Sequence, residues 1–398
     1  MPNPWIETPK ADALSKEQLD VYSASLDKNL IINGAAGSGK TILGIHRARQ
    51  LGLKNKKVLF ITFTNVLTAF TKVAAKEFKT PNVTVCMLQD LTFKVFRRRF
   101  INPEEMTDNQ LAKFLREIRK YDYLIIDEGQ DFDLIMYERI FKKLGEKYSI
   151  CMDRNQSIYD VEFNVRGIKS LLNPIEEIFL QFTYRNPRKI LKLSIEFYKN
   201  RYRKIPSDFE GVKDSDFKIK VYNKTEGVIK LYHTANELET VTDLINNRGD
   251  NTTGVLLPTN KAVKYFSDCL IERGINNIEK KWSIGDRFWE NDISFDNTKP
   301  KVLTFHSAKG IQFDNVIIPF LENDYPEGVC YTNAHKEAKA FYVAITRTRK
   351  SLFFTKPLEH SFPYEEDLDT QFIEEVQKDE KEKLEIKDIY DFGDDLPF

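Results

Sequence analysis

The sequence is poor in the features that mark secreted, membrane-spanning and zinc-binding proteins. Its four cysteines are far apart in 398 residues and form no CxxC pair, which argues against a disulfide framework or a zinc site. No apolar run approaches the roughly 18 residues needed to cross a bilayer. The first residues lack the basic and apolar regions of a signal peptide. We therefore expect a cytoplasmic protein that does not contact a membrane.

A net charge is also missing, yet charge is unevenly distributed along the chain. Lys plus Arg and Asp plus Glu number 60 each. Residues 365–398 hold fourteen acidic residues and four lysines, a net charge of −10, so residues 1–364 carry 56 basic and 46 acidic residues, a net charge of +10. A basic body with an acidic tail is one layout of proteins that handle nucleic acid, but it needs a site to go with it.

Short apolar runs recur along the chain, which is 41% hydrophobic and 30% charged. Runs of four to six residues rich in Ile, Val, Leu and Phe are typical of buried parallel strands. We predict ten strands, at Leu30–Asn33, Lys57–Thr62, Tyr123–Asp127, Ser149–Met152, Ile178–Gln181, Val228–Tyr232, Thr253–Leu257, Lys301–Thr304, Asn315–Pro319 and Ser351–Thr355.

Segments with helical spacing lie between many of these runs, which indicates an α/β fold. The strands form two groups that divide near Thr183, and this predicts parallel-sheet domains in tandem at residues 1–182 and 183–360. Apolar residues are sparse in residues 361–398, where we expect an acidic, partly disordered tail. Helical spacing is clearest at Thr41–Leu51, Pro187–Arg203, Asn236–Asn246, Lys261–Arg273 and Lys336–Arg347.

A glycine-rich loop, GAAGSGKT, follows the first predicted strand and opens a predicted helix. It fits the P-loop pattern G-x-x-x-x-G-K-[ST] in the context that this pattern requires. Its glycines let backbone N–H groups face an anion, and the helix N-terminus adds partial positive charge. Lys40 can reach the β- and γ-phosphates of ATP, and Thr41 can hold Mg²⁺. The loop consists of Gly34, Ala35, Ala36, Gly37, Ser38, Gly39, Lys40 and Thr41.

Two acidic residues, Asp127 and Glu128, follow the predicted strand that ends at Ile126. In a P-loop enzyme this position holds Mg²⁺ and its water, so Asp127 would bind the metal through water. Glu128 would accept the proton of the attacking water. Paired carboxylates beside a P-loop favour ATP hydrolysis over nucleotide binding alone.

The sequence DEGQD at residues 127–131 resembles a box of the UvrD/Rep-like superfamily 1 helicases, and the resemblance extends over roughly Leu14–Phe354. It implies two RecA-like domains, ATP and Mg²⁺ as cofactors, and movement along single-stranded nucleic acid, with DNA favoured over RNA and a 3′ to 5′ direction. The other motifs, in the family's order, are LSKEQ, TFTN, DRNQSIY, TYR, TFHSAKGIQFDNVIIP and FYVAITRTR.

The resemblance also implies roles for single residues at the nucleotide. Gln18 would read adenine, and Tyr184 would stack on it. Gly310 and Gln312 lie in a segment that can touch the ribose. The side chains implied at the γ-phosphate are Gln156, Arg185 and Arg347, the last as the arginine finger. An arginine from a second domain reaches ATP only when the two domains close, so nucleotide would act as a clamp.

Nucleic-acid contacts are expected at the carboxyl ends of the sheets, where aromatic side chains can stack on bases regardless of sequence. Part of this set comes from the family's motifs and part from the aromatic residues themselves, for which a place in the core is the alternative. The candidates are Phe63, Thr64, Asn65, Tyr159, Trp282, Trp289, Thr304 and His306.

The chain is short for this family, whose full members insert an accessory subdomain into each core domain. Only 86 residues separate Lys40 from Asp127, and only 118 separate Arg185 from Thr304. We therefore expect a translocase or helicase-like motor in DNA repair, replication or defence. One alternative is a nucleic-acid-stimulated ATPase switch for a separate nuclease or repair partner. The other is a scaffold that binds nucleotide without turnover.

The last residues of the chain resemble the acidic tip of bacterial single-stranded-DNA-binding proteins. A terminal Phe can fill an apolar pocket while nearby carboxylates meet a basic rim, as a docking peptide does. We expect a protein partner to bind this tip; a tail that folds back on the basic body is the alternative. The tip consists of Asp394, Asp395, Leu396, Pro397 and Phe398.

Overall fold

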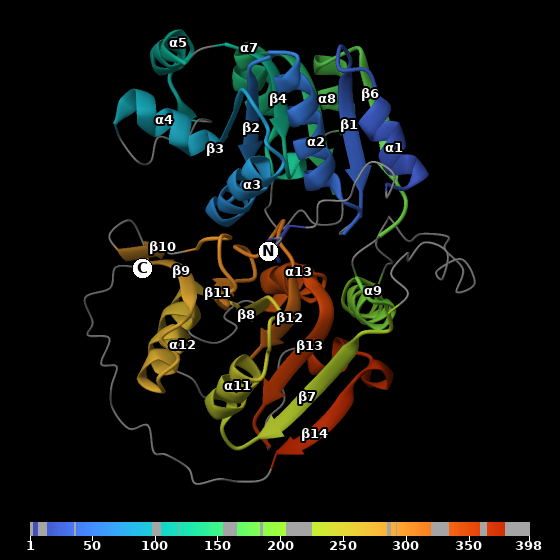
Figure 1. Cartoon of the computed structure of the whole chain (residues 1–398), viewed down its shortest axis with the longest axis vertical. Helices are drawn as coiled ribbons and strands as arrows, with labels where there is room; N and C mark the ends of the chain where they lie inside the picture. The colour runs from blue at the N-terminus through green and yellow to red at the C-terminus, as the bar shows by residue number, and fades with distance from the viewer. Residues whose placement is uncertain are drawn as a thin grey trace.

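The chain folds around two sheets, each built from one half of the sequence. In Figure 1 the strands of the N-terminal half, blue to green, lie above those of the C-terminal half, yellow to red. Within the part that is described, no helix has the length and apolar character needed to cross a membrane. The computed structural model describes residues 3–6, 14–35, 37–97, 105–118, 120–153, 165–183, 186–203, 225–284, 288–291, 293–319, 334–358 and 364–378.

The first sheet has six strands: β1 (Asn29–Gly34), β2 (Val58–Thr62), β3 (Val83–Met87), β4 (Tyr121–Ile126), β5 (Gly145–Met152) and β6 (Ile175–Leu180). All are parallel, in the order β3-β2-β4-β5-β1-β6. Every residue of β1 and β2 is buried, as expected for continuous apolar runs inside a parallel sheet. Because β5 alone separates β1 from β4, the carboxyl ends of β1 and β4 meet at one edge of the sheet.

Helices connect these strands: α1 (Lys16–Ser23), α2 (Lys40–Leu53), α3 (Asn65–Glu77), α4 (Leu88–Phe96), α5 (Asp108–Glu117), α6 (Leu134–Met136), α7 (Lys142–Leu144) and α8 (Val165–Leu171). Three of them start at a hydroxyl side chain that accepts a hydrogen bond from a backbone N–H of the first turn. These N-cap residues are Ser15, Thr64 and Thr107. A 3-10 turn (Gly129–Asp131) follows β4, and a π turn (Tyr137–Phe141) lies between α6 and α7.

The second sheet has eight strands: β7 (Val228–Thr234), β8 (Thr253–Leu257), β9 (Glu279–Ile284), β10 (Phe288–Asn291), β11 (Lys301–Thr304), β12 (Phe313–Ile318), β13 (Thr348–Lys356) and β14 (Glu374–Lys378). Their order is β10-β9-β11-β8-β12-β13-β7-β14, and only the β9–β10 pair is antiparallel. The helices described in this half are α9 (Arg188–Tyr202), α11 (Glu237–Asn246), α12 (Asn260–Glu272) and α13 (Ala334–Ile345).

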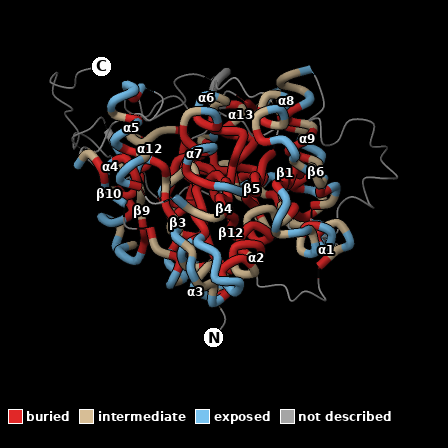
Figure 2. Tube along the Cα trace, turned by 90° about the horizontal axis from the view of Figure 1, so that it is seen from above, coloured by how far each residue is buried: buried red, intermediate tan, exposed pale blue. Residues whose placement is uncertain are grey.

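All ten predicted strands are present, and they form two sheets, so the predicted α/β fold of two parallel-sheet domains is confirmed. Buried residues follow the strands through the middle of the molecule (Figure 2). Four further strands, β3, β9, β10 and β14, were not predicted. β3, β10 and β14 lie at the ends of the two sheets, and β9 lies between β10 and β11. Most side chains described in β3, β9 and β14 are exposed or half-buried, so the apolar pattern of these strands is weak.

The start of the acidic tail expected at residues 361–398 is ordered. Residues 374–378 form β14, which pairs in parallel with β7 at the edge of the second sheet. An ion pair of 3.0 Å between Lys230 and Glu374 accompanies this pairing, and the His233 ring lies 3.4 Å from a carboxylate oxygen of Glu375. The strand is held by main-chain hydrogen bonds and charges rather than by apolar burial, so hydrophobic spacing did not reveal it. Residues 379–398 lie outside the described part.

The N-terminal segment, residues 3–6, packs on the second sheet rather than on the first. Trp5 is buried, and its ring meets Phe295 and Phe313 edge-on at centroid distances of 5.2 and 5.6 Å. Its indole N–H donates to the carbonyl of Asn297, and the Asn3 amide donates to the carbonyl of Phe295 at 2.7 Å. The two ends of the described chain therefore stabilise the same half of the molecule.

Replacing Trp5 by alanine should lower the free energy of unfolding by about 3–5 kcal/mol, because it empties a buried aromatic site. Thermal unfolding followed by circular dichroism measures the loss. Trp5→Phe is the matched control, since it keeps most of the ring contacts and should lose clearly less. A Trp5→Ala protein that unfolds at the wild-type temperature would show that this segment does not stabilise the fold.

Candidate functional site

The glycine-rich loop joins β1 to α2 and encloses the side chain of Lys40. Gly37 and Gly39 have φ angles of 77° and 93°, which L side chains rarely adopt. The Lys40 ammonium donates to the carbonyls of Gly34 and Ala35 at 2.6 and 2.9 Å. It also lies 3.7 Å from a carboxylate oxygen of Asp153, at the end of β5. The Lys40 ammonium is therefore held by two backbone carbonyls of the loop and by the nearby carboxylate of Asp153.

The shape of this loop fits a phosphate group. A Cβ on Gly34 would lie 2.8 Å from the Cβ of Leu180, so only glycine fits there. The Ser38 hydroxyl is fully buried and has no hydrogen-bond partner among the described residues. Such a hydroxyl needs a partner, which a phosphate oxygen would supply. A phosphate chain in this loop would therefore satisfy the Ser38 hydroxyl and the ammonium of Lys40 together.

The first acid of the DEGQD box meets the end of this loop. The Thr41 hydroxyl donates to a carboxylate oxygen of Asp127 at 2.7 Å. Burial, followed by the charge of Glu128, raises the pKa of Asp127 to about 7. A hydroxyl and a carboxylate at this spacing are oxygen ligands of the kind that Mg²⁺ prefers. Thr41 and Asp127 are therefore the residues that would hold a magnesium ion.

Glu128 adopts a left-handed backbone conformation, with φ 55°, which is strained for a residue with a side chain. Its carboxylate accepts a hydrogen bond from the Gln130 amide at 2.5 Å. Burial acts to raise its pKa, but the positive charges of Lys309, Lys40 and Arg347 hold the pKa of Glu128 below its usual value. The pKa values of the two neighbouring acids are thus shifted in opposite directions, which leaves Glu128 ionised and able to accept a proton.

A lysine of the second domain completes this acidic cluster. Lys309 is fully buried, and its ammonium lies 2.8 and 2.6 Å from the two carboxylate oxygens of Asp131. The same ammonium is 3.6 Å from Glu128. We had not singled out Lys309 or Asp131 from the sequence. The one feature of the sequence that could have identified them is their position inside the SAKG and DEGQD motifs. This interdomain ion pair joins the acidic residues that follow β4 directly to the second sheet.

The predicted arginine finger lies in the same region. Arg347 is buried just after α13, where its guanidinium donates to the Val343 carbonyl at 3.0 Å and the Thr346 hydroxyl at 3.0 Å. Burial lowers its pKa, and the negative charges of Glu128 and Asp153 act against that shift. The structure therefore brings together residues that are distant in the sequence, namely Lys40, Thr41, Asp127, Glu128 and Arg347.

Gln18, predicted at the adenine, lies against the phosphate loop. Its amide donates to the Ser38 carbonyl at 3.0 Å, and its carbonyl accepts from the Ser15 backbone N–H, which closes a capping box. Arg47 of α2 is fully buried and donates to the carbonyls of Val21, Ala24 and Ser25 at the end of α1. The sequence analysis did not predict a structural role for Arg47. It holds α1, and with it Gln18, on the loop.

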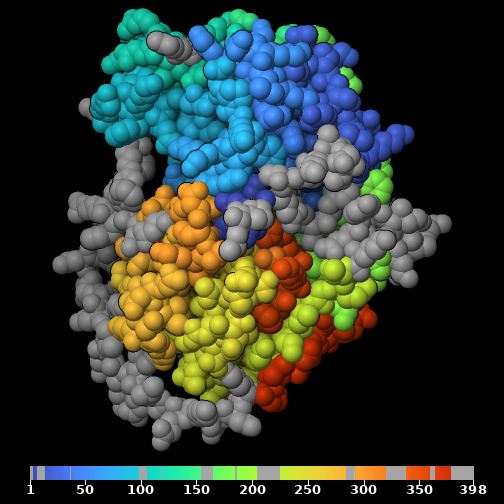
Figure 3. Space-filling model, viewed as in Figure 1, coloured from blue at the N-terminus to red at the C-terminus, as the bar shows by residue number. Residues whose placement is uncertain are grey.

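Packing between the domains explains the glycine at position 310. Gly310 has φ 82°, and a Cβ there would lie 2.7 Å from Leu67 of α3. Nearby, the rings of Phe70 and Phe295 meet edge-on at 5.5 Å. Figure 3 shows the orange segment that includes β11 directly below the light blue segment that includes α3. Gln312 is buried here as well. Contacts of Gly310 and Gln312 with nucleotide stay a prediction.

The expected nucleic-acid residues of the first domain lie at the start of α3. Thr64 caps the helix by accepting from the Leu67 N–H at 3.1 Å, and Asn65 is exposed beside it. Phe63 is half-buried, with its ring edge-on to Phe132 at 5.2 Å. Thr64 and Asn65 are therefore accessible to a single strand of nucleic acid, whereas the ring of Phe63 packs partly in the core.

The expected residues of the second domain lie on and beside β11. Thr304 accepts a hydrogen bond from the Ser307 N–H at 3.0 Å. His306 is half-buried, and burial followed by the charge of Lys309 lowers its pKa, so it is neutral near pH 7. Trp282 on β9 lies under the ammonium of Lys264, 5.8 Å from the ring centroid. None of these contacts tests nucleic-acid binding, which stays a prediction.

Several predicted site residues lie outside the described part of the chain, so their roles stay predictions. For Trp289 the backbone is described, as part of β10, and the side chain is not. The others are Ala36, Gln156, Tyr159, Tyr184, Arg185, Asp394, Asp395, Leu396, Pro397 and Phe398.

The chain is similar to known helicases in both halves. A family model described as "AAA domain" matches residues 18–162, and one described as "UvrD-like helicase C-terminal domain" matches residues 289–359. The ATP-dependent DNA helicase PcrA of Bacillus subtilis is 24% identical over 313 residues, covering 73% of this chain and 42% of PcrA. A probable DNA helicase of Mycoplasma pneumoniae is 24% identical over 262 residues, covering 60% of this chain and 44% of that protein.

Among solved structures, the Pif1 helicase from Bacteroides, in complex with ADP-AlF3 and single-stranded DNA, is 11% identical. The alignment covers 88% of this chain and 93% of that chain, with a TM-score of 0.45. The chain spans less than half the length of the two curated helicases.

Proposed function

Since this chain belongs to the UvrD/Rep-like family of superfamily 1 helicases, we propose that it is an ATP-hydrolysing motor that moves along single-stranded DNA. One observation carries the proposal. Lys309 of the second domain pairs with Asp131 and approaches Glu128, so the closure of the two domains and the charge of the hydrolytic acids depend on each other.

The hydrolytic step uses side chains that already lie together. Glu128 is ionised and accepts the proton of the attacking water. Lys40 and Arg347 stabilise the negative charge that develops on the phosphoryl group and the leaving phosphate. Mg²⁺, held by Thr41 and Asp127, would neutralise charge between the phosphates. Hydrolysis splits the γ-phosphate from ADP, and the departure of this phosphate ends the contact that both domains share, so the domains separate and the nucleic-acid strand can advance.

DNA is the preferred strand in this proposal because the curated relatives are named as DNA helicases. The direction of movement, 3′ to 5′, follows from the resemblance in the motifs. A role in DNA repair, replication or defence and a place in the cytoplasm belong to the same proposal. The boundaries 1–182, 183–360 and 361–398 also stay a proposal, with residues 3–6 and 364–378 packing on the second domain.

A second candidate function is an ATPase switch that responds to nucleic acid and serves a separate nuclease or repair partner. It is favoured by the short internal spacers, 86 residues between Lys40 and Asp127 and 118 between Arg185 and Thr304, where full members of the family insert accessory subdomains. The tip Asp394–Phe398 would dock that partner. A nucleotide-binding scaffold without turnover is disfavoured, because Glu128 is held ionised beside the phosphate loop.

The test is ATP hydrolysis by the purified chain alone, with single-stranded DNA and with RNA. We expect DNA to raise the rate at least about tenfold and RNA to raise it less. The same stimulation must be lost in Lys40→Ala, which removes the phosphate contact. A rate indifferent to both polymers would contradict the proposal.

A displacement assay separates the motor from the switch. A motor removes streptavidin from a biotin at the 5′ end of a single strand in the presence of ATP. A switch shows the same stimulated hydrolysis and leaves the streptavidin in place.

A further inference from the structure

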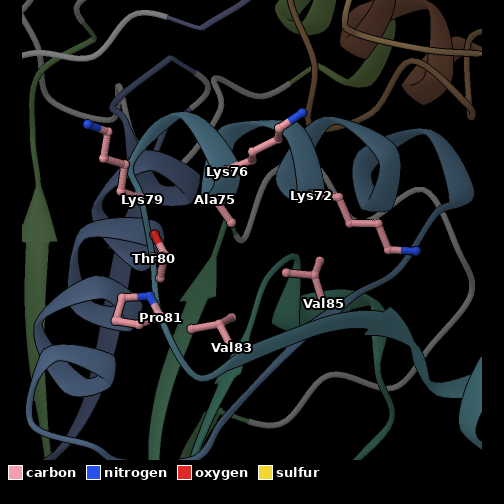
Figure 4. Close-up of a pocket in the computed structure, with 8 residues that line it drawn as sticks. All are labelled: Lys72, Ala75, Lys76, Lys79, Thr80, Pro81, Val83 and Val85. Carbon is pink, nitrogen blue, oxygen red and sulfur yellow. The ribbon is translucent and has the colours of Figure 1, made fainter.

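A lysine-lined groove lies between α3 and β3, on the first domain and outside the ATP site (Figure 4). Its volume is about 410 Å³. Lys72, Lys76 and Lys79 extend from α3 and the turn after it, while Val83 and Val85 of β3 form the apolar floor. The remaining lining residues are Ala75, Thr80 and Pro81.

The charges of this groove are not balanced locally. All three lysines are exposed, and none of them forms an ion pair within the part of the chain that is described. Three like charges along one helix and its turn repel one another, since helix positions four apart are neighbours. A ligand that brings several carboxylates would relieve this repulsion.

The floor of the groove is the free edge of a sheet. β3 is the last strand of the first sheet and, among the described strands, pairs with β2 alone. Its outer N–H and C=O groups can therefore accept a further strand. Peptides bind such edges by main-chain hydrogen bonds, with alternate side chains entering pockets. An edge with valines below and lysines beside it fits an extended peptide that is both apolar and acidic.

The chain carries a segment with this chemistry. Residues 379–398 contain eight acidic residues and three lysines, a net charge of −5. Tyr390 and Phe392 flank Asp391, so an extended backbone places the two aromatic side chains on one face and the acid on the other. The segment follows β14 directly, and the twelve residues 379–390 span roughly 40 Å when extended. This is about twice the radius of gyration of a folded body of this length, which is roughly 21 Å, and it leaves the last eight residues for docking.

We propose that the acidic segment, residues 379–398, docks intramolecularly in the groove between α3 and β3. It adds a strand along the edge of β3, with its carboxylates against Lys72, Lys76 and Lys79. Because α3 begins at Thr64 and Asn65, the docked segment lies on the same helix as the residues expected to contact single-stranded nucleic acid.

Lysine footprinting of the full-length chain tests this proposal. Brief acetylation at low salt, read by mass spectrometry, compares the wild type with the full-length variant Asp388→Asn/Asp391→Asn/Asp394→Asn/Asp395→Asn. We expect the three groove lysines to react at least about fivefold more slowly in the wild type. Lys142 and Lys143, exposed on α7, serve as internal controls and should react equally in both proteins. In 1 M salt the difference should disappear, because charge interactions are screened beyond about 3 Å.

Three outcomes would overturn the proposal. The first is equal reactivity of the groove lysines in the two proteins at low salt. The second is protection that is lost on tenfold dilution, which would assign the contact to a second copy of the chain. The third is protection of the groove lysines by added single-stranded DNA with no difference between the two proteins in its absence, which would assign the groove to nucleic acid.

Limited trypsin digestion gives a second reading from the tail itself. In the wild type, cleavage after Lys387 should be at least about threefold slower than in Lys72→Gln/Lys76→Gln/Lys79→Gln. The matched control is Lys142→Gln/Lys143→Gln, which should be cleaved like the wild type. Equal cleavage in all three proteins would contradict docking of the tail.

Discussion

The Glu128→Gln variant should bind ATP at least as tightly as the wild type and hydrolyse it about 10²–10⁴ times more slowly. Glutamine has nearly the same shape but cannot accept the proton of the attacking water, and a positioned base contributes about this factor. Binding is kept because the substitution removes a negative charge near the phosphates. Stopped-flow binding of a fluorescent ATP analogue and single-turnover hydrolysis measure the two effects separately.

Glu138→Gln is the matched control for this variant, because it makes the same exchange at an exposed position of the π turn. It should hydrolyse ATP at the wild-type rate. If Glu128→Gln kept more than about a tenth of the wild-type rate, Glu128 would not be the base, and the assignment of the acid pair would have to change.

The Lys309→Met variant should lose both stability and DNA-stimulated hydrolysis. It leaves the carboxylates of Asp131 and Glu128 buried without their shared cation, and breaking one side of a buried pair costs about 3–5 kcal/mol. We expect lower thermal stability and a stimulated rate reduced at least about a hundredfold. Lys299→Met, at an exposed position close in sequence, should behave like the wild type in both assays.

The pH dependence of hydrolysis distinguishes this electrostatic role from mere loss of packing. Lys309 is the strongest of the charges that lower the pKa of Glu128, so removing it raises that pKa. A base with a raised pKa is protonated at higher pH, and the acid limb of the pH–rate profile should shift to higher pH in Lys309→Met. An acid limb unchanged from the wild type would show that Lys309 does not act on Glu128.

A second variant keeps the test informative if Lys309→Met folds poorly. Lys309→Met/Asp131→Leu replaces the ion pair by apolar side chains and should recover much of the lost stability, since such exchanges are often neutral or stabilising. The stimulated hydrolysis should stay low, because the interdomain charge is still missing. Full recovery of hydrolysis would contradict a coupling role for the ion pair.

Much of the fold was predictable because each buried strand appears in the sequence as a short apolar run. Parallel strands buried on both faces appear as continuous apolar runs, and all ten that we predicted are present. The four strands β3, β9, β10 and β14 could not be found in this way. β14 has the sequence EEVQK and is held by pairing to β7 and by the ion pair between Lys230 and Glu374, neither of which leaves an apolar pattern in the sequence.

Some residues of the candidate site could likewise be predicted from the sequence, and others could not. Lys40, Thr41, Asp127 and Glu128 could be predicted because each follows a strand within a short motif. Lys309 could not, because its function depends on a partner 178 positions away that only the packing of two domains brings within hydrogen-bond distance. Contacts between residues far apart in the sequence cannot in general be predicted from spacing, because the two residues share no common motif.

The packing of Trp5 has a practical consequence for dissecting the protein. A fragment that begins near residue 183 would lack the indole that fills the site between Phe295 and Phe313. The missing residues belong to the opposite end of the chain, so a cut between the two halves would expose apolar surface on one fragment and leave a loose arm on the other. Circular permutation, which moves residues 3–6 next to the second half, is the more suitable route to an isolated C-terminal half. A bulky fusion partner belongs away from the N-terminus.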